Sequence, residues 1–161
     1  MIEPITFLTF LPAALALNLT PGADMMFCLG QGLRSGPRAA WAASAGISAG
    51  GMVHVALAGL GLGAAVQAMP WLFDAIRWVG VVYLLWLAWG ALRQGAVAAN
   101  APPRAARHAF RDGMLVNLTN PKVILFVLAF IPQFVSPEAG PILPQFLVFG
   151  AIIGVGGFVI N

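Results

Sequence analysis

The stretch Asn117-Leu118-Thr119-Asn120-Pro121-Lys122 lies inside an apolar run that continues as Val123-Ile124-Leu125-Phe126-Val127-Leu128. Proline cannot donate the backbone hydrogen bond that continues a helix, and a lysine surrounded by hydrocarbon is costly. A related stretch, Asn18-Leu19-Thr20-Pro21-Gly22, precedes Asp24 and another apolar run. Two helix-breaking stretches, one beside an acid and one beside a base, are typical of a transporter built from two related halves.

The composition is that of a chain solvated by lipid. Sixty per cent of the residues are apolar and 8% are charged, whereas a soluble domain carries roughly 25% charged residues. The 161 residues could supply about five spans of roughly 20 residues each, which leaves little room for a soluble domain. The net charge of +3 comes from basic residues in short loops, a placement that sets membrane orientation and does not indicate nucleic-acid binding. We predict an all-α integral membrane protein, a polytopic helix bundle in the lipid bilayer that forms one domain over 1–161.

Five apolar runs are the predicted spans. They cover about 5–33, 39–67, 71–92 and 113–134, with the fifth beginning near 142–144. The first run is longer than a straight span needs. Pro21-Gly22 is expected to break it into two half-helices, with Asn18 and Thr20 able to satisfy the backbone groups that the break frees.

Small residues indicate where helices pack. Gly46 and Gly50 in the second run have the small-xxx-small spacing that lets two helix backbones approach closely. Gly150 and Gly154 repeat this spacing in the fifth run. We expect both pairs to lie at helix contacts.

The basic residues predict how the chain is oriented. Those assigned to one side of the membrane are Arg34, Arg38, Arg93, Arg104, Arg107 and Arg111, with Arg77 alone on the other side. The positive-inside rule then places the arginine-rich loops in the cytoplasm and the N-terminus in the periplasm. Four residues of the connection 93–112 have the spacing of one helical stripe and suit a short helix on an anionic leaflet: Arg104, Arg107, His108 and Arg111.

The spans divide into two repeats. The first covers about 5–92 and the second, after the linker 93–112, about 113–161. With three spans in each half, the second helix-breaking stretch enters the membrane in the opposite sense to the first, which makes a 3+3 inverted repeat. Only five spans are present and the sixth is missing. We expect the sequence to be truncated at its C-terminus, with a genuine five-span protein as the alternative.

The two helix-breaking stretches are predicted to meet in the middle of the membrane. Asp24 lies ten residues before Arg34, and Lys122 eleven residues after Arg111. At about 1.5 Å per residue both are about 15 Å deep, half of a hydrocarbon core of about 30 Å. Asp24 and Lys122 should therefore meet near the midplane, paired or facing a wet cavity. Broken helices there present N-termini to an anion and carbonyls to a cation, which suits a zwitterion.

Two other readings of these charges stay open. A buried ion pair between Asp24 and Lys122 could serve only to hold the two halves together. Alternatively, the side chain of Lys122 could extend to the cytoplasmic surface, although about 15 Å exceeds its reach.

Other polar residues complete the predicted site. Neutral hydrogen bonds to the substrate are expected from Asn18, Thr20, Asn117 and Asn120, and the breaks are shaped by Pro21, Gly22 and Pro121. The asparagines could instead only cap the half-helices. His54 lies mid-span and is either a proton relay or a hydrogen-bonded packing residue. Because Asp24 is the only acid clearly inside a span, neither a metal site nor a cofactor is predicted.

Motifs spread over most of the chain match one known family. They are Pro21-Gly22-Ala23-Asp24-Met25, Gly80 with Tyr83-Leu84, Gly113, Asn117-Leu118, Asn120-Pro121-Lys122, and the run from Phe126 to Pro132-Gln133-Phe134. These residues resemble the LysE/RhtB family of amino-acid exporters. Ala23 stands where that family often has a second proline, which implies a milder break here. The resemblance implies six spans and export of amino acids or relatives such as homoserine lactones, driven by the proton gradient.

The sequence thus predicts a secondary transporter of the bacterial inner membrane, and not an enzyme. It would export a small zwitterionic amino acid or a close derivative by proton antiport. Asp24 would bind the substrate ammonium or a coupling proton, and Lys122 would face the carboxylate. An exporter of another solute or of an inorganic cation, a membrane-embedded enzyme and a non-transporting helper subunit remain alternatives. No serine-base spacing or His/Glu metal cluster favours the enzyme. A homo-oligomer is compatible with the sequence.

Overall fold

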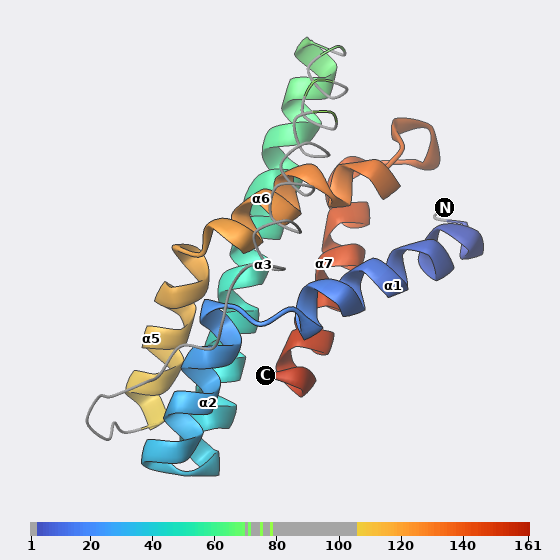
Figure 1. Ribbon diagram of the computed structural model, residues 1–161. Helices are drawn as coiled ribbons and strands as arrows, with labels where there is room; N and C mark the ends of the chain where they lie inside the picture. The colour runs from blue at the N-terminus through green and yellow to red at the C-terminus, as the bar shows by residue number, and fades with distance from the viewer. Residues whose placement is uncertain (1–2, 70, 72–74, 76–77, 79–105) are drawn as a thin grey trace.

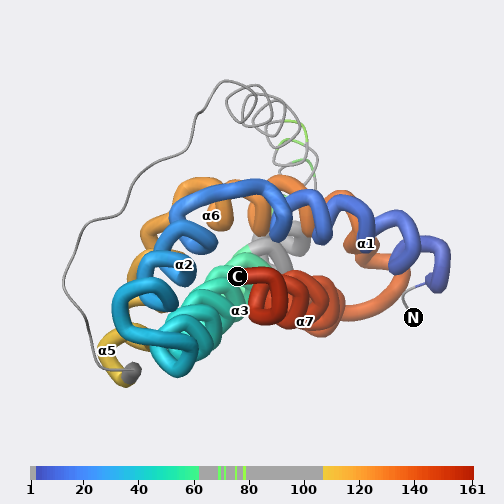
Figure 2. Tube along the Cα trace, turned by 60° about the horizontal axis from the view of Figure 1, so that its bottom comes forward, coloured from blue at the N-terminus to red at the C-terminus, as the bar shows by residue number. Residues whose placement is uncertain are grey.

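The computed structural model describes residues 3–69, 71, 75, 78 and 106–161, and these contain helices and no strand. The elements are α1 (Pro4–Leu19), α2 (Ala23–Ser35), α3 (Pro37–Ala68), α5 (Ala106–Leu118), α6 (Pro121–Ala129), the 3-10 helices η1 (Ile131–Phe134) and η2 (Pro137–Ala139), and α7 (Ile142–Ile160). Figure 1 shows α3 as the long axis of the bundle, with α2 and α5 beside its first half and α7 on another face. Figure 2 looks along the bundle and shows α3 between α5 and α7.

α3 and α5 run side by side in the same direction with their backbones in contact. A Cβ atom added at Gly46 would collide with the carbonyl oxygen of Phe110, and one added at Gly113 would collide with that of Ala43. At Gly50 an added Cβ would lie 2.9 Å from another carbonyl oxygen of α5. Helices approach this closely only where one of them lacks a side chain. The prediction that Gly46 and Gly50 lie at a helix contact is confirmed.

α7 packs against α3 in the antiparallel direction. The Ser44 hydroxyl donates to the carbonyl oxygen of Phe158 at 2.9 Å, and the Ser48 hydroxyl donates to that of Gly154, also at 2.9 Å. Gly150 faces α3 one turn further on. The predicted packing role of Gly150 and Gly154 is therefore confirmed, and serine hydroxyls add hydrogen bonds to this contact.

Both helix-breaking stretches divide a bent pair of helices. The chain bends by 52° between α1 and α2, across Thr20–Gly22, and by 56° between α5 and the segment Pro121–Phe134. Asn120 has extended backbone angles (φ −79°, ψ 108°) between α5 and α6. Pro121 is the first residue of α6, a position at which its missing N–H would have no partner in any case. The two predicted breaks are confirmed.

Four of the five predicted spans have counterparts. By length and composition, Pro37–Gly61 and Ile142–Ile160 could each cross a membrane, and the two bent pairs bring the total to four if each pair is one span. The predicted third span, 71–92, lies outside the described residues apart from three isolated positions. The five-span count and the inverted repeat therefore stay predictions.

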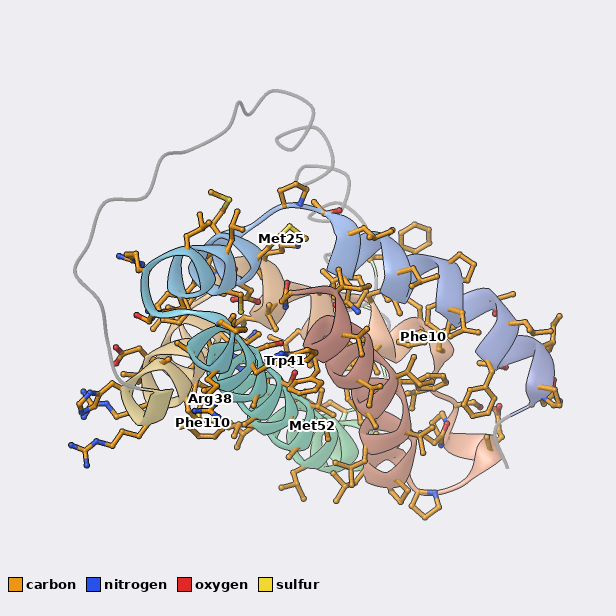
Figure 3. The ribbon with its side chains drawn as sticks, turned by 90° about the horizontal axis from the view of Figure 1, so that it is seen from below. Phe10, Met25, Arg38, Trp41, Met52 and Phe110 are labelled. Atoms are coloured by element: carbon orange, nitrogen blue, oxygen red, sulfur yellow. The ribbon has the colours of Figure 1, made fainter. Side chains whose placement is uncertain are left out.

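α5 begins at Ala106, inside the predicted linker 93–112. Three residues of the predicted basic stripe, Arg107, His108 and Arg111, lie in its first turns, and Arg104 lies outside the described residues. Ala109, on the other face of these turns, is fully buried, because α5 packs against α3 from its start. Figure 3 shows Arg38, near the start of α3, at the same end of the molecule as Phe110. The described basic ends of α3 and α5 are therefore neighbours.

Large apolar side chains lie on the outside of the bundle. On α1 the exposed ones are Ile5, Leu8, Leu11, Leu15 and Leu19. Their spacing of three or four residues makes one continuous stripe along the helix. An apolar face of this kind, which stays exposed in the described part of the chain, fits contact with lipid.

The glycine contact predicts a specific packing defect. Gly46→Ala should lower the free energy of unfolding by about 1–3 kcal/mol, because the new methyl group must push α5 away from α3. Thermal unfolding of the detergent-solubilised protein measures the change. Gly61→Ala is the matched control on the same helix, since nothing lies within 4 Å of a Cβ added there. Equal unfolding temperatures for the two variants would contradict the close contact.

Candidate functional site

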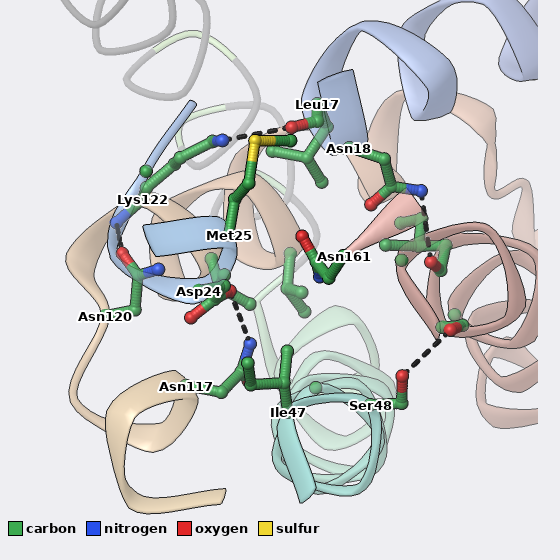
Figure 4. Close-up of a pocket in the computed structure, with 18 of the residues that line it drawn as sticks. Leu17, Asn18, Asp24, Met25, Ile47, Ser48, Asn117, Asn120, Lys122 and Asn161 are labelled. Carbon is green, nitrogen blue, oxygen red and sulfur yellow. Dashed lines mark hydrogen bonds between the residues drawn. The ribbon is translucent and has the colours of Figure 1, made fainter. Parts of the chain in front are cut away.

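A cavity lies where the two helix breaks face α3 and α7 (Figure 4). Its polar lining residues are Asn18, Thr20, Asp24, Ser48, Asn117, Asn120, Lys122 and Asn161. The cavity holds about 60 Å³ of space that water can reach. At about 10–15 Å³ for each water position, that is room for roughly four to six water-sized groups. All six residues predicted to bind substrate or coupling ion line this one cavity.

Asp24 is held by Asn117 and keeps one oxygen unpaired. Its carboxylate, in the first turn of α2, accepts a hydrogen bond from Nδ2 of Asn117 at 2.9 Å (Figure 4). The other carboxylate oxygen of Asp24 and Oδ1 of Asn117 are both buried without a hydrogen-bond partner. Asn117 is only 3% exposed. A buried acceptor without a donor costs about 1–3 kcal/mol, and more when it is charged. The two oxygens therefore form a site ready for a cation or another donor.

Lys122 binds the end of α1 rather than Asp24. Its ammonium donates to the carbonyl oxygens of Leu17 at 3.0 Å and Thr20 at 2.7 Å. A helix leaves its last carbonyls unpaired, and its dipole favours a cation beside them. Both charged residues are described, and no ion pair joins them. Of the two arrangements predicted for Asp24 and Lys122, the structure shows the shared cavity and not the direct ion pair. The alternative in which Lys122 extends to the surface does not fit its contacts with α1. The two charges instead face one cavity from different breaks.

The remaining predicted residues have separate partners. Oδ1 of Asn120 accepts from the backbone N–H of Lys122 at 3.0 Å and caps α6, as the capping alternative expected. The Thr20 hydroxyl donates to the carbonyl oxygen of Ala16, which also accepts the backbone N–H of Thr20, so it does not satisfy a group that the break frees. Asn18 does not satisfy the break: its side chain donates to the carbonyl oxygen of Ile153 at 3.2 Å and ties α1 to α7.

Gly22 keeps the flank of Lys122 open. It has extended backbone angles (φ −162°, ψ −173°), so the conformation does not require glycine. A Cβ added there would lie 3.5 Å from both Cδ and Nζ of Lys122. No side chain caps the N-terminus of α2, which begins at the next residue. Together with Pro21 in the break, Gly22 leaves backbone N–H groups and an ammonium side by side.

His54 packs against the same break from α3. Its Nε2 lies 3.3 Å from the carbonyl oxygen of Asn117, and it is not among the described residues that line the cavity. This geometry fits the hydrogen-bonded packing residue, and the proton relay stays a prediction. In the part of the chain that the structure describes, no group of three or more His, Cys, Asp or Glu could hold a metal ion.

Most of the other lining residues were not predicted, among them Ser48, Gly51 and Asn161. Ser44 and Ser48 are four residues apart on the face of α3 that packs against α7, a spacing that could have identified Ser48 as an inward-facing residue. A Cβ at Gly51 would lie 3.7 Å from the unpaired Oδ1 of Asn117. The absent side chain thus leaves space beside that oxygen.

Comparisons with known proteins identify the family of this chain. The family model of the LysE type translocator matches residues 15–160. The chain belongs to this family. An uncharacterized membrane protein of Vibrio cholerae is 36% identical over 147 residues, 89% of this chain and 71% of that protein. No solved structure matches the chain.

Two further relatives of this LysE type translocator carry functional names. The homoserine/homoserine lactone efflux protein of Salmonella typhimurium is 33% identical over 144 residues, 88% of this chain and 69% of that protein. The leucine efflux protein of Klebsiella pneumoniae is 34% identical over 141 residues, 84% of this chain and 66% of that protein. Family and relatives support an exporter, and they point to a membrane transporter rather than an enzyme.

The contacts of Lys122 predict that it stabilises the fold. Lys122→Met keeps an unbranched side chain but removes both hydrogen bonds to the end of α1, so unfolding should cost about 2 kcal/mol less. Thermal unfolding in detergent measures this loss. Thr119→Ala is the control at the same break, because the Thr119 hydroxyl bonds only to carbonyls of its own helix. Unchanged stability of the Lys122 variant would show that the contacts with α1 contribute nothing.

Proposed function

We propose that this protein exports amino acids or close derivatives across the bacterial inner membrane by proton antiport. The observation that carries the proposal is the pair of unpaired oxygens, on Asp24 and Asn117, facing a small cavity between two broken helices. An amino-acid ammonium offers the hydrogen-bond donors and the positive charge that these oxygens lack. The names of the relatives, which specify homoserine, its lactone and leucine, support the same class of substrate.

The carboxylate of the substrate would bind beside Lys122 and the N-terminus of α2. Lys122 has three N–H donors and uses two of them on carbonyls of α1. The uncapped N-terminus of α2 lies beside it at Gly22. A carboxylate placed there would accept from the third N–H of Lys122 and from backbone N–H groups, with the helix dipole in its favour. The cavity thus offers separate partners for both charges of a zwitterion.

Antiport would result from exchange of the substrate ammonium for a proton at Asp24. Asp24 would bind either the substrate ammonium or the coupling proton, because both compete for the same oxygens. Rocking of one repeat against the other, about the two breaks, would open the cavity to each side in turn. With the basic ends of α2, α3 and α5 in the cytoplasm, the positive-inside rule places the N-terminus in the periplasm.

Uptake by inside-out membrane vesicles tests this assignment. Labelled amino acids should accumulate when a proton gradient is imposed, and Asp24→Asn should reduce this uptake about tenfold or more. The reason is that a charge-assisted hydrogen bond contributes about 1.5–3 kcal/mol, and 1.4 kcal/mol is a factor of ten.

The matched control is Glu138→Gln, which removes the charge of an exposed acid whose carboxylate bonds to Ser136. It should leave uptake unchanged. Full uptake by the Asp24 variant would contradict the role of the carboxylate. Uptake of no amino acid by the wild-type protein, although folded, would favour another solute or a helper role.

A further inference from the structure

The cavity has two chemically different ends. Val55, Val123 and Val127 line it and also belong to the main hydrophobic cluster of the core. Val55 and Val127 are each 2% exposed. The charges that bind the head group in the proposed function, on Asp24 and Lys122, come from the helix breaks. No charged residue other than these two is among the described residues that line the cavity.

The helix register separates the two ends by about one turn. The unpaired oxygen of Asn117 lies over Gly50 and Gly51 on α3, 3.1 Å and 3.7 Å from Cβ atoms added at these two positions. Val55 is four residues beyond Gly51 along α3, which is about 6 Å. On α6, Val127 is five residues beyond Lys122, about 7.5 Å along the axis. Val55 and Val127 therefore each lie about one turn beyond the head-group partner on their own helix, whereas Val123 directly follows Lys122.

We infer that this valine end holds the side chain of the substrate, so that the exporter selects amino acids or derivatives with a small, uncharged, aliphatic side chain. The inference rests on the proposed function. A substrate whose ammonium meets Asp24 and Asn117 directs its side chain either to the valines or back to the breaks. At the valine end a second charge would be buried without a partner among the described lining residues, at a cost of several kcal/mol.

Val55 limits the length of side chain that fits. A Cβ added at Gly150 would lie 2.5 Å and 2.6 Å from the two methyl groups of Val55. These methyl groups thus rest directly against the backbone of α7, and they cannot move further toward it. One methylene more or less in an apolar pocket changes discrimination by about 10–200-fold. Val55 is therefore the residue expected to separate short from long aliphatic substrates.

Competition for uptake in inside-out vesicles tests the inference. Alanine, valine, leucine, lysine and glutamate are offered to the wild-type protein and to Val55→Ala. The wild-type protein should take up uncharged amino acids only. Val55→Ala should raise the uptake of leucine relative to alanine by about tenfold, because it removes two methyl groups from the far end of the cavity. Val127→Ala, which shortens the opposite wall, is a second variant with the same expected direction.

Val53→Ala is the matched control, since Val53 lies two residues away on α3 with 41% of its surface exposed on the outside. It should leave the ratio of leucine to alanine uptake unchanged. If Val55→Ala and Val127→Ala still transport amino acids but leave the ratio of leucine to alanine uptake unchanged, the inference is overturned and the proposed function stays intact. Uptake of lysine or glutamate by the wild-type protein would have the same consequence. Uptake of no amino acid at all would overturn the proposed function and the inference with it.

Discussion

A helix that breaks inside a membrane must have its freed backbone groups satisfied by the protein, because hydrocarbon offers no hydrogen bonds. The rest of this structure depends on how that constraint is met. The end of α1 is satisfied by the ammonium of Lys122, which comes from the other broken pair. The start of α6 is satisfied by Asn120 within its own break. The contact made by Lys122 therefore joins the two breaks and fixes the place of the cavity between them.

Because Lys122 is used in this way, Asp24 has no direct ion-pair partner among the described residues. Asn117 supplies one hydrogen bond, and one oxygen of each side chain stays buried and unpaired. A direct ion pair between Asp24 and Lys122 would have closed the site with a stable internal contact. The observed arrangement divides the charges, so that a ligand with both signs of charge can gain from each of them. Such a gain is what binding needs to offset desolvation of the ligand.

α3 holds these parts in place through two different contacts. Toward α5 it presents glycines, so the two backbones touch and Asn117 lies directly over Gly50 and Gly51. Toward α7 it presents Ser44 and Ser48, whose hydroxyls bond to backbone carbonyls. Both contacts are short in range and depend on small side chains. The cavity therefore lies at the junction of close-packed helices, where small movements of one helix change its walls.

Much of this could be read from the sequence, because the relevant signals are local. Apolar runs of sufficient length, prolines flanked by asparagine or threonine, and glycines four residues apart each act within one helix, and they correctly indicated the membrane class, the two breaks and the packing faces. Only the tertiary structure decided which residues on different helices contact one another. Spacing from the ends of the spans put Asp24 and Lys122 at similar depth, but it could not show that the ammonium of Lys122 turns to the carbonyls of α1. Nor could it show that Asn18 reaches α7 or that Val55 meets Gly150, because each of these contacts joins residues about 95 to 135 positions apart, and such pairings depend on how the helices pack.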